Sequence, residues 1–487
     1  MGRQKWYRPI PLAVGSATAV ALMIYLIIAL SRWFNLSSPS WDLAIFEQAV
    51  RGYAEGTGPI IDVKGPGTNQ LGDHFSPALA LLALPYRVFP SAVTLLVIQC
   101  GLVAWSVGIV AIAAGRVWGG RGALCLGLAY GLSWGLATGI NAEFHEYALA
   151  VPFIALSLSA YLGRRWLRCF AFGLVWLFIK EDLAFNLAAL GLVMALSGLA
   201  ARRRAIRQSD DSPSGALADA TVRIRLGFTM TGLSLVLAAV VFGLVIPYFR
   251  GGEQWEYWNK VPAGSILDVL AGLWNGQKIL LVALLLGVTL GVAVASPLFL
   301  VALPTLAWRL VSDNPHYWGT AWHYSMILMP IVFLAAIDAA RRLKRSPGRL
   351  WRALGRHLPL LSLCFALAAV PFFPGRAAFM PSSYHASPDL PAAETILRAI
   401  PDDTLVVTDT GLMSRLSGRC RVVWLGGGAD QVVPDYILFD KAAWASDPGE
   451  PAAYGESVYP GTTFVTVEPD GTGGENRRFR LAMRIRP

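Results

Sequence analysis

The sequence predicts an all-α polytopic membrane protein with a small extracytoplasmic α/β domain at its C-terminal end. Three observations predict this fold class. The 487 residues are 55% hydrophobic and only 15% charged, whereas about a quarter of the residues in a soluble protein are charged. Apolar runs of about 20 residues, each long enough to cross the hydrocarbon core as a helix, recur up to residue 374. From residue 375 onward these runs stop, and aspartate, proline and glycine become frequent.

The apolar runs predict about eleven transmembrane helices within residues 1–374. The first run follows Arg3, Lys5 and Arg8 and has no small-residue cleavage site after it, so we expect an uncleaved span and not a signal peptide. In chain order the predicted spans are 12–32, 91–115, 122–141, 147–163, 169–180, 183–201, 226–247, 277–295, 297–312, 324–340 and 357–373.

The basic residues predict the orientation. The apolar segment 75–90 is short for a span. If it does not cross, all basic clusters fall on one side, as the positive-inside rule requires. We therefore expect an interfacial or re-entrant helix over 75–90 inside an outer loop 33–90. The N-terminus and a disordered linker 202–224 are then cytoplasmic, and residues 375–487 are extracytoplasmic. The net charge of +10 follows from this rule, and no basic face indicates a nucleic-acid partner.

The C-terminal segment has the pattern of a small α/β domain. A helix is expected over 391–400, and short β-rich runs predict strands at 404–408, 421–425 and 436–440. Four of the five cysteines lie in or beside apolar segments, and the fifth lies in this domain. This distribution predicts neither a disulfide framework nor a thiolate metal site.

The predicted outer loops contain an unusual set of ionisable residues, which indicates a functional site on that face of the membrane. Solvated loops with interfacial aromatic residues are the alternative explanation. The candidate catalytic residues are Asp42, Glu47, Asp73 and His74, and the candidate substrate-binding residues are Glu143, His145, Glu146, Lys180, Glu181, Arg250, His316 and His323.

Asp42 is the leading candidate within this set. On a helical wheel of residues 41–53 it falls within the apolar face formed by Leu43, Phe46 and Val50, whereas Glu47 lies on the opposite, polar face. An acidic residue in a first helical turn also stabilises the helix dipole by about 0.3–1 kcal/mol. The functional alternative is a carboxylate that faces a cavity and acts as a base.

Two further interpretations remain open at this stage. Glu143 and Glu146 share a face if their turn is helical, and with His145, Asp73 and His74 they form a candidate set of ligands for a divalent metal ion, although no H-E-x-x-H spacing is present. Lys180 either forms a local ion pair with its acidic neighbours or binds a phosphate as a point charge.

The segments 40–48, 72–77, 144–146 and 180–183 resemble motifs of a bacterial family of predicted membrane proteins, domain of unknown function 2079. That family is similar to the GT-C superfamily of membrane glycosyltransferases. The resemblance implies a GT-C-like fold in the bacterial plasma membrane. It also implies inverting transfer of a hexose or pentose from a polyprenyl-phosphate donor to a glycan, lipid or protein acceptor on the outer face.

By this resemblance Asp42 is the catalytic base, and Lys180 or Arg250 neutralises the phosphate. The superfamily's usual adjacent acid pair is not present, since Glu47 follows five residues after Asp42. Two alternatives are a transporter or flippase of lipid-linked glycans and a non-catalytic envelope assembly protein. A transporter is expected to show internal repeats and ionisable groups near mid-membrane, whereas the polar groups here lie at the span ends, which favours the enzyme.

Overall fold

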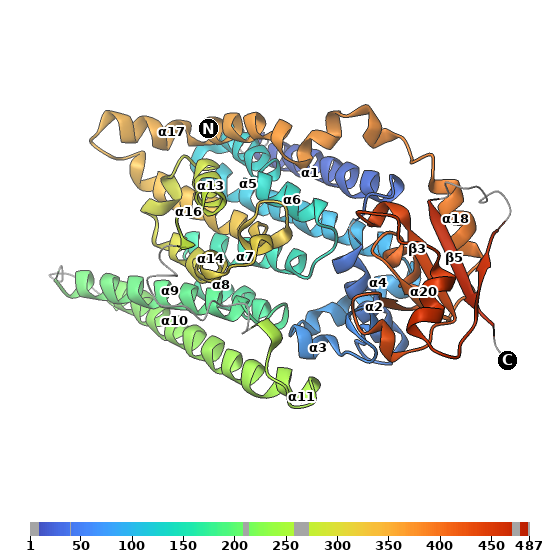
Figure 1. Ribbon diagram of the computed structural model, residues 1–487. Coiled ribbons are helices and arrows are strands. Elements are labelled where there is room, and N and C mark those ends of the chain that lie inside the picture. Colours follow the sequence, from blue (N-terminus) through green and yellow to red (C-terminus); the bar gives the residue numbers. More distant parts are fainter. Residues whose placement is uncertain (1–8, 39, 208–213, 258–271, 470–477, 486–487) are drawn as a thin grey trace.

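The computed structural model describes residues 9–38, 40–207, 214–257, 272–469 and 478–485. A bundle of helices forms the larger part, and the C-terminal sheet with its helices lies against one end of the bundle (Figure 1). The N-terminal basic residues Arg3, Lys5 and Arg8, used above to predict the orientation, lie outside the described ranges.

The apolar segments form the helices of the bundle. They are α1 (Pro9–Phe34), α5 (Ala92–Gly131), α6 (Trp134–Asn141), α7 (Tyr147–Leu162), α8 (Trp166–Leu174), α9 (Leu183–Arg207), α10 (Ser214–Val240), α11 (Ile246–Phe249), α13 (Gly276–Gly287), α14 (Leu303–Val311), α16 (Leu328–Leu343) and α17 (Arg349–Ala369). Gly119 bends α5 with a φ of 73°, between the two spans predicted there. Five of the described helices are long and apolar enough to cross a membrane. The chain is a multi-pass membrane protein.

Two predicted connections can be compared with the structure. The expectation of a disordered linker over 202–224 is wrong for the described part, because α9 continues to Arg207 and α10 begins at Ser214; residues 208–213 lie outside the described ranges. Segment 75–90 contains a 3₁₀ turn at Pro77–Leu82 and the short helix α4 (Ala83–Val88). These twelve residues span at most about 24 Å even with 3₁₀ rise, too short to cross about 30 Å of hydrocarbon.

The C-terminal segment forms a mixed sheet of five strands in the order β2-β1-β3-β5-β4. The strands are β1 (Leu405–Thr408), β2 (Arg421–Trp424), β3 (Tyr436–Asp440), β4 (Phe464–Val467) and β5 (Phe479–Arg484). The first three coincide with the predicted strands and are parallel, and α18 (Leu390–Arg398) coincides with the predicted helix. The sequence pattern missed β4 and β5, which pair antiparallel.

Helix α2 (Trp41–Glu55) lies between the bundle and the C-terminal domain. Its Gln48 side chain donates to the Val422 carbonyl at 2.9 Å and accepts from the Val63 amide at 3.0 Å. Arg51 donates to the Cys420 carbonyl at 3.2 Å. The polar face of this helix is therefore covered by the C-terminal domain. Since buried polar groups need partners, these contacts fix the position of α2 on both sides.

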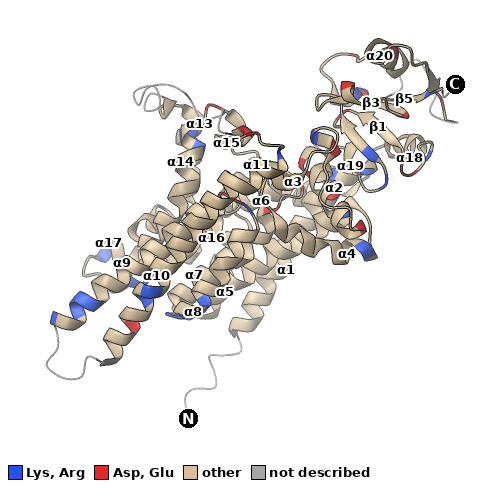
Figure 2. Cartoon of the chain, turned by 90° about the horizontal axis from the view of Figure 1, so that it is seen from below, with Lys and Arg blue, Asp and Glu red and all other residues tan. Residues whose placement is uncertain are grey.

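Charged residues are distributed unevenly along the bundle. Lys and Arg gather at the ends of α8, α9 and α10, whereas most Asp and Glu of the bundle lie near α2, α3 (Gln70–Asp73) and α15 (Pro315–Trp318) (Figure 2). The positive-inside rule would place the first end in the cytoplasm. The orientation itself stays a prediction.

Candidate functional site

The site is built around the first turn of α2. Asp42 stands there with its side chain 19% exposed, and its Oδ2 lies 3.3 Å from Nδ1 of His323. Ser40, just before the helix, has a left-handed backbone with φ 57°, and so has Glu143 with φ 71°. Such conformations are costly for residues other than glycine and persist where the surrounding structure enforces them. The Glu143 side chain interacts electrostatically with both Asp42 and the Ser40 backbone.

Two histidines from distant loops meet beside Asp42. The rings of His145 and His323 stack with centroids 3.4 Å apart and planes 24° from parallel. Both residues are buried, and neither ring nitrogen of His323 makes a hydrogen bond within the described structure. Burial, together with the charges of His323 and Lys180, lowers the pKa of His145 well below its ordinary value. This shift in pKa favours the neutral imidazole.

Behind the histidines lies a buried ion pair, Glu146 with Lys180, and its neighbours. Glu146 Oε2 is 3.1 Å from Nδ1 of His145, and its other oxygen accepts from the Lys180 ammonium at 2.5 Å. The Tyr147 amide also donates to that histidine nitrogen at 3.3 Å. The Tyr147 hydroxyl donates to Asp182 at 2.5 Å. Because Lys180 is buried and paired, it neutralises this acidic cluster and is not exposed to a ligand.

A second group of ion pairs lies beside the first and contacts the same loop, residues 180–182, through Glu181. His74 Nδ1 lies 2.7 Å from a carboxylate oxygen of Glu181, and Lys64 donates to Asp73 at 2.5 Å. Burial opposes the charge on His74, but Glu181 and Asp73 outweigh it and raise the pKa of His74. The pKa of Asp73 is lowered, because His74 and Lys64 outweigh its own burial. Each acid of this group is thus matched with a cation.

Glu143 is the exception among the buried acids. It is 3% exposed, and neither carboxylate oxygen has a well-formed hydrogen bond in the described structure. Burial raises the pKa of Glu143 to about 8, and Asp42 adds to the effect, against the opposing influence of Arg32 and the Ser40 backbone. A carboxyl group beside Asp42 whose pKa lies near neutral pH is suited to proton transfer.

Three predicted site residues lie outside the cluster of Asp42, His145 and His323. His316 is exposed and meets Trp322 edge-on at 5.3 Å between ring centroids. Arg250 lies at the end of α11 and is 3.3 Å from Glu253. Glu47 is buried on the far side of α2, where it accepts hydrogen bonds from Tyr86, at 3.0 Å, and from Ser417.

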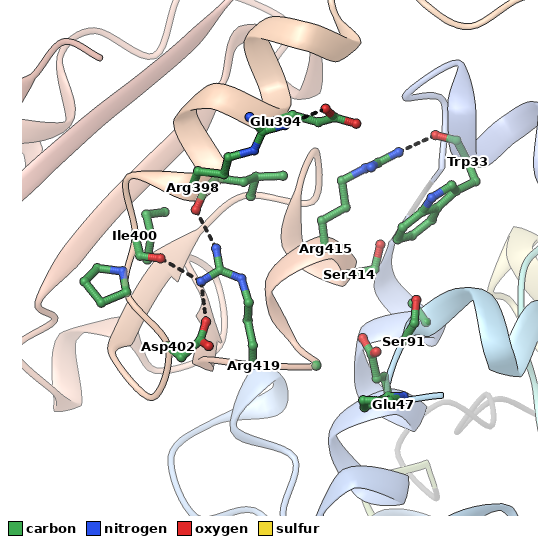
Figure 3. A pocket seen from close by; sticks show the side chains of 15 residues that line it. Trp33, Glu47, Ser91, Glu394, Arg398, Ile400, Asp402, Ser414, Arg415 and Arg419 are labelled. Atoms are coloured by element: carbon green, nitrogen blue, oxygen red, sulfur yellow. Dashed lines mark hydrogen bonds and ion pairs between the residues drawn. The ribbon is translucent and has the colours of Figure 1, made fainter. Parts of the chain in front are cut away.

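Glu47 lines a cavity of about 730 Å³ at the junction with the C-terminal domain. Figure 3 shows Glu47, Ser91 and Trp33 on the bundle side of this cavity and Arg398, Arg415 and Arg419 on the domain side. Asp42 is not among its lining residues. Residues 42 and 47 are five positions apart, which places them about 140° apart around a helix. The cavity and the histidine cluster therefore adjoin different faces of α2.

Arg309 is a site residue that the sequence analysis missed. It is fully buried in α14 and donates to the Tyr317 carbonyl at 2.5 Å, to Ser325 at 3.1 Å and to the Gly319 carbonyl at 3.4 Å. These bonds hold the loop that carries His323. An arginine inside the predicted apolar span 297–312 was the available signal, since charges in such segments are costly and usually functional.

The structure also changes the predicted metal grouping. Asp73 and His74 belong to the second ion-pair group, and Glu146 is bound by Lys180. The ligand atoms that lie within 4.8 Å of one another belong to Asp42, His145 and His323. Two imidazoles and a carboxylate suit a divalent transition metal. The same trio can alternatively exchange protons with a bound hydroxyl group.

The comparisons with known proteins identify the family and the fold. The model of the DUF2079 family, described as a predicted membrane protein, matches residues 32–459. The chain belongs to this family. Two solved structures of ArnT from Cupriavidus metallidurans, one bound to undecaprenyl phosphate and one apo, are similar to this member of the family. Each has a TM-score of 0.53 and 14% identity over 96% of this chain and 97% of ArnT. The comparison with curated proteins found no match. This DUF2079 protein thus shares the fold of ArnT.

Proposed function

We propose that the protein is a membrane glycosyltransferase that moves a sugar from a polyprenyl-phosphate donor to a cell-envelope acceptor on the outer face of the bacterial plasma membrane. The observation that carries the proposal is the cluster of Asp42, His145 and His323 at one end of a GT-C-like bundle. The ArnT structure bound to undecaprenyl phosphate shares this fold over nearly its whole length and so supports a lipid-linked donor.

In the proposed reaction, an acceptor hydroxyl attacks the anomeric carbon of the donor and inverts its configuration. The bond between the acceptor oxygen and the anomeric carbon forms as the bond between that carbon and the phosphate oxygen breaks. The electron pair of the broken bond remains on the phosphate, and Asp42 takes the hydroxyl proton. Proton transfer by a positioned base accelerates such reactions by about 10²–10⁴-fold.

The remaining predicted residues take supporting roles in this proposal. Lys180 and Glu146 hold His145 in place, and Glu181 holds His74 and the Phe75 amide. Arg250 is the candidate for the donor phosphate, because it is one-fifth exposed and its contacts with Glu253 and Glu256 are long, at 3.3 and 3.9 Å. Glu47 is assigned to the junction with the C-terminal domain.

The test uses purified protein in detergent or nanodiscs with a panel of polyprenyl-phosphate sugars. We expect the wild type to cleave or transfer at least one donor, and Asp42→Asn to lose about 10²–10⁴-fold in rate. Asp338→Asn is the matched control, because Asp338 pairs with Arg342 near the far end of α16. Equal activity of Asp42→Asn and wild type would remove Asp42 from the mechanism, and no turnover of any donor would contradict the proposed activity.

A further inference from the structure

We propose that Asp42, His145 and His323 bind one divalent transition-metal ion. The three residues come from α2, from the loop between α6 and α7, and from the turn before α16. One ligand atom from each lies within 4.8 Å of the other two. The fold therefore brings together a two-histidine, one-carboxylate set that no local motif in the sequence specifies.

The contact between Asp42 and His323 has the geometry of two ligands of one ion. Oδ2 and Nδ1 are 3.3 Å apart, yet His323 makes no hydrogen bond through either nitrogen in the described structure. Two ligands each about 2.0–2.1 Å from a tetrahedral ion lie about 3.3 Å from one another. The observed separation agrees with this value.

The burial of His323 without a well-formed hydrogen bond supports the same assignment. His323 has a side chain only 5% exposed, and a buried polar group without a partner is costly. A metal ion would satisfy one ring nitrogen directly.

The surroundings resemble those of metal sites with a reactive role. Metal-bound histidines are usually oriented by hydrogen bonds from groups behind them, and Nδ1 of His145 accepts from the Tyr147 amide at 3.3 Å, close to Glu146. Three protein ligands leave coordination positions open for water or a substrate oxygen. Asp42, at 19% exposure, is the ligand that borders the accessible side.

This inference adds to the proposed function and does not depend on it. One carboxylate oxygen of Asp42 is enough for the ligand set, so the other remains available to an acceptor hydroxyl. An open metal position beside Asp42 is suited to a phosphate oxygen of the donor. Metal binding is measured without any sugar donor, so failure of the metal site and failure of the transferase activity are separate outcomes.

The experiment measures metal content and affinity in the full-length protein, purified without a histidine tag. The protein is stripped with a chelator, loaded with Zn²⁺ or Mn²⁺, desalted and analysed by inductively coupled plasma mass spectrometry. We expect about one ion per chain, and an affinity at least about tenfold weaker in His323→Ala and in Asp42→Ala. His316→Ala is the matched control, since His316 is exposed and outside the cluster, and it should bind like the wild type.

Asp42→Ala protects the test against misfolding, because Asp42 is partly exposed and its replacement leaves the buried histidines in place. Cobalt substitution gives a second readout through the visible absorption of a site with nitrogen and oxygen ligands. A wild type that retains less than a tenth of an ion per chain would overturn the inference. Equal metal affinity of the wild type, His323→Ala and Asp42→Ala would also overturn it.

Discussion

Asp42 and Glu47 lie on the same helix, α2, but differ in exposure and in hydrogen bonding. Asp42 is partly exposed and borders stacked histidines, one of which lacks hydrogen bonds in the described structure. Glu47 is 1% exposed and accepts two hydroxyl hydrogen bonds, one from Tyr86 of the bundle side and one from Ser417 of the C-terminal domain. A buried polar group whose hydrogen bonds are all made stabilises the structure. A group whose neighbours still lack hydrogen-bond partners is available for chemistry. We therefore assign the reaction to the face of α2 that carries Asp42 (the Asp42 face). The opposite face, which carries Glu47 and contacts the C-terminal domain (the Glu47 face), is assigned to assembly.

The largest expected effect comes from breaking the ion pair behind the histidines. Lys180→Met leaves Glu146 buried without its cation, and loss of one partner of a buried pair costs about 3–5 kcal/mol. We expect a large fall in the apparent thermal unfolding midpoint in detergent. The double variant Lys180→Met/Glu146→Gln should recover much of this loss. A single variant as stable as the wild type would show that the pair does not support the Asp42 face.

The second prediction concerns the pH dependence of the Glu47 face. Burial raises the pKa of Glu47 to about 7, despite the bonds from Ser417 and Tyr86. A raised pKa means that the folded protein retains this proton more strongly than the unfolded chain. The stabilisation is therefore complete below about pH 4.5 and is lost as the pH rises through 7, by about 3 kcal/mol at most.

Glu47→Gln should remove this part of the pH dependence. The measurement is the difference in unfolding midpoint between wild type and variant from pH 5 to 8.5, since other buried acids titrate in both proteins. We expect the unfolding midpoint of Glu47→Gln to rise relative to that of the wild type as the pH increases. Glu394→Gln, an exposed residue lining the same cavity, should give a constant difference, and a constant difference for Glu47→Gln would contradict the prediction.

A smaller effect is expected from the loop that carries His323. Arg309→Lys keeps the charge but cannot reproduce three hydrogen bonds from a planar guanidinium. We expect a loss of about 1.5–3 kcal/mol in unfolding free energy, with a larger loss in turnover because His323 shifts. Hydrogen exchange of residues 315–325 would report the loosened loop, and unchanged exchange there would remove Arg309 from this role.

The smallest effect is expected at the rim of the Glu47 face. Arg421 of β2 meets Asp62 at 3.1 Å, but the arginine side chain is 57% exposed. Exposed ion pairs contribute about 0–1 kcal/mol. Arg421→Gln should therefore change the unfolding midpoint by little, with turnover unchanged. A loss as large as that of Lys180→Met would mean that the junction depends on its rim and not on its buried hydrogen bonds.

Features that depend on residues close in the sequence could be predicted, whereas features that depend on contacts between distant residues could not. Local apolar runs and β-rich segments predicted the helices of the bundle and strands β1 to β3. The family motifs contained Asp42 and His145, and the predicted outer loops contained His323; these three residues do meet. In contrast, the cover over Gln48 and Glu47 is made by Val422 and Ser417, more than 360 positions away. The pattern of apolar and polar residues within one segment carries no information about such a contact.

Other features were hidden for related reasons. The position of Glu47 opposite Asp42 was predicted from the helical wheel, but a polar face resembles a solvated one until its partner domain is placed. The linker over 202–224 has a disorder-prone composition, yet neighbouring apolar turns extend α9 and α10 into it. Arg309 had a local signal, a charge in an apolar segment, but its role depends on carbonyls in a folded loop.

The most direct test of the division of α2 compares turnover by Asp42→Asn and Glu47→Gln on one polyprenyl-phosphate sugar that the wild type uses. Both are isosteric replacements of a carboxylate by an amide, and the rates are compared at equal amounts of folded protein near pH 6. We predict that Asp42→Asn loses about 10²–10⁴-fold in rate, while Glu47→Gln stays within about threefold of the wild type, since a surviving interface leaves the site intact. Full activity in Asp42→Asn, or an equal loss in both variants, would contradict the assignment of chemistry to the Asp42 face.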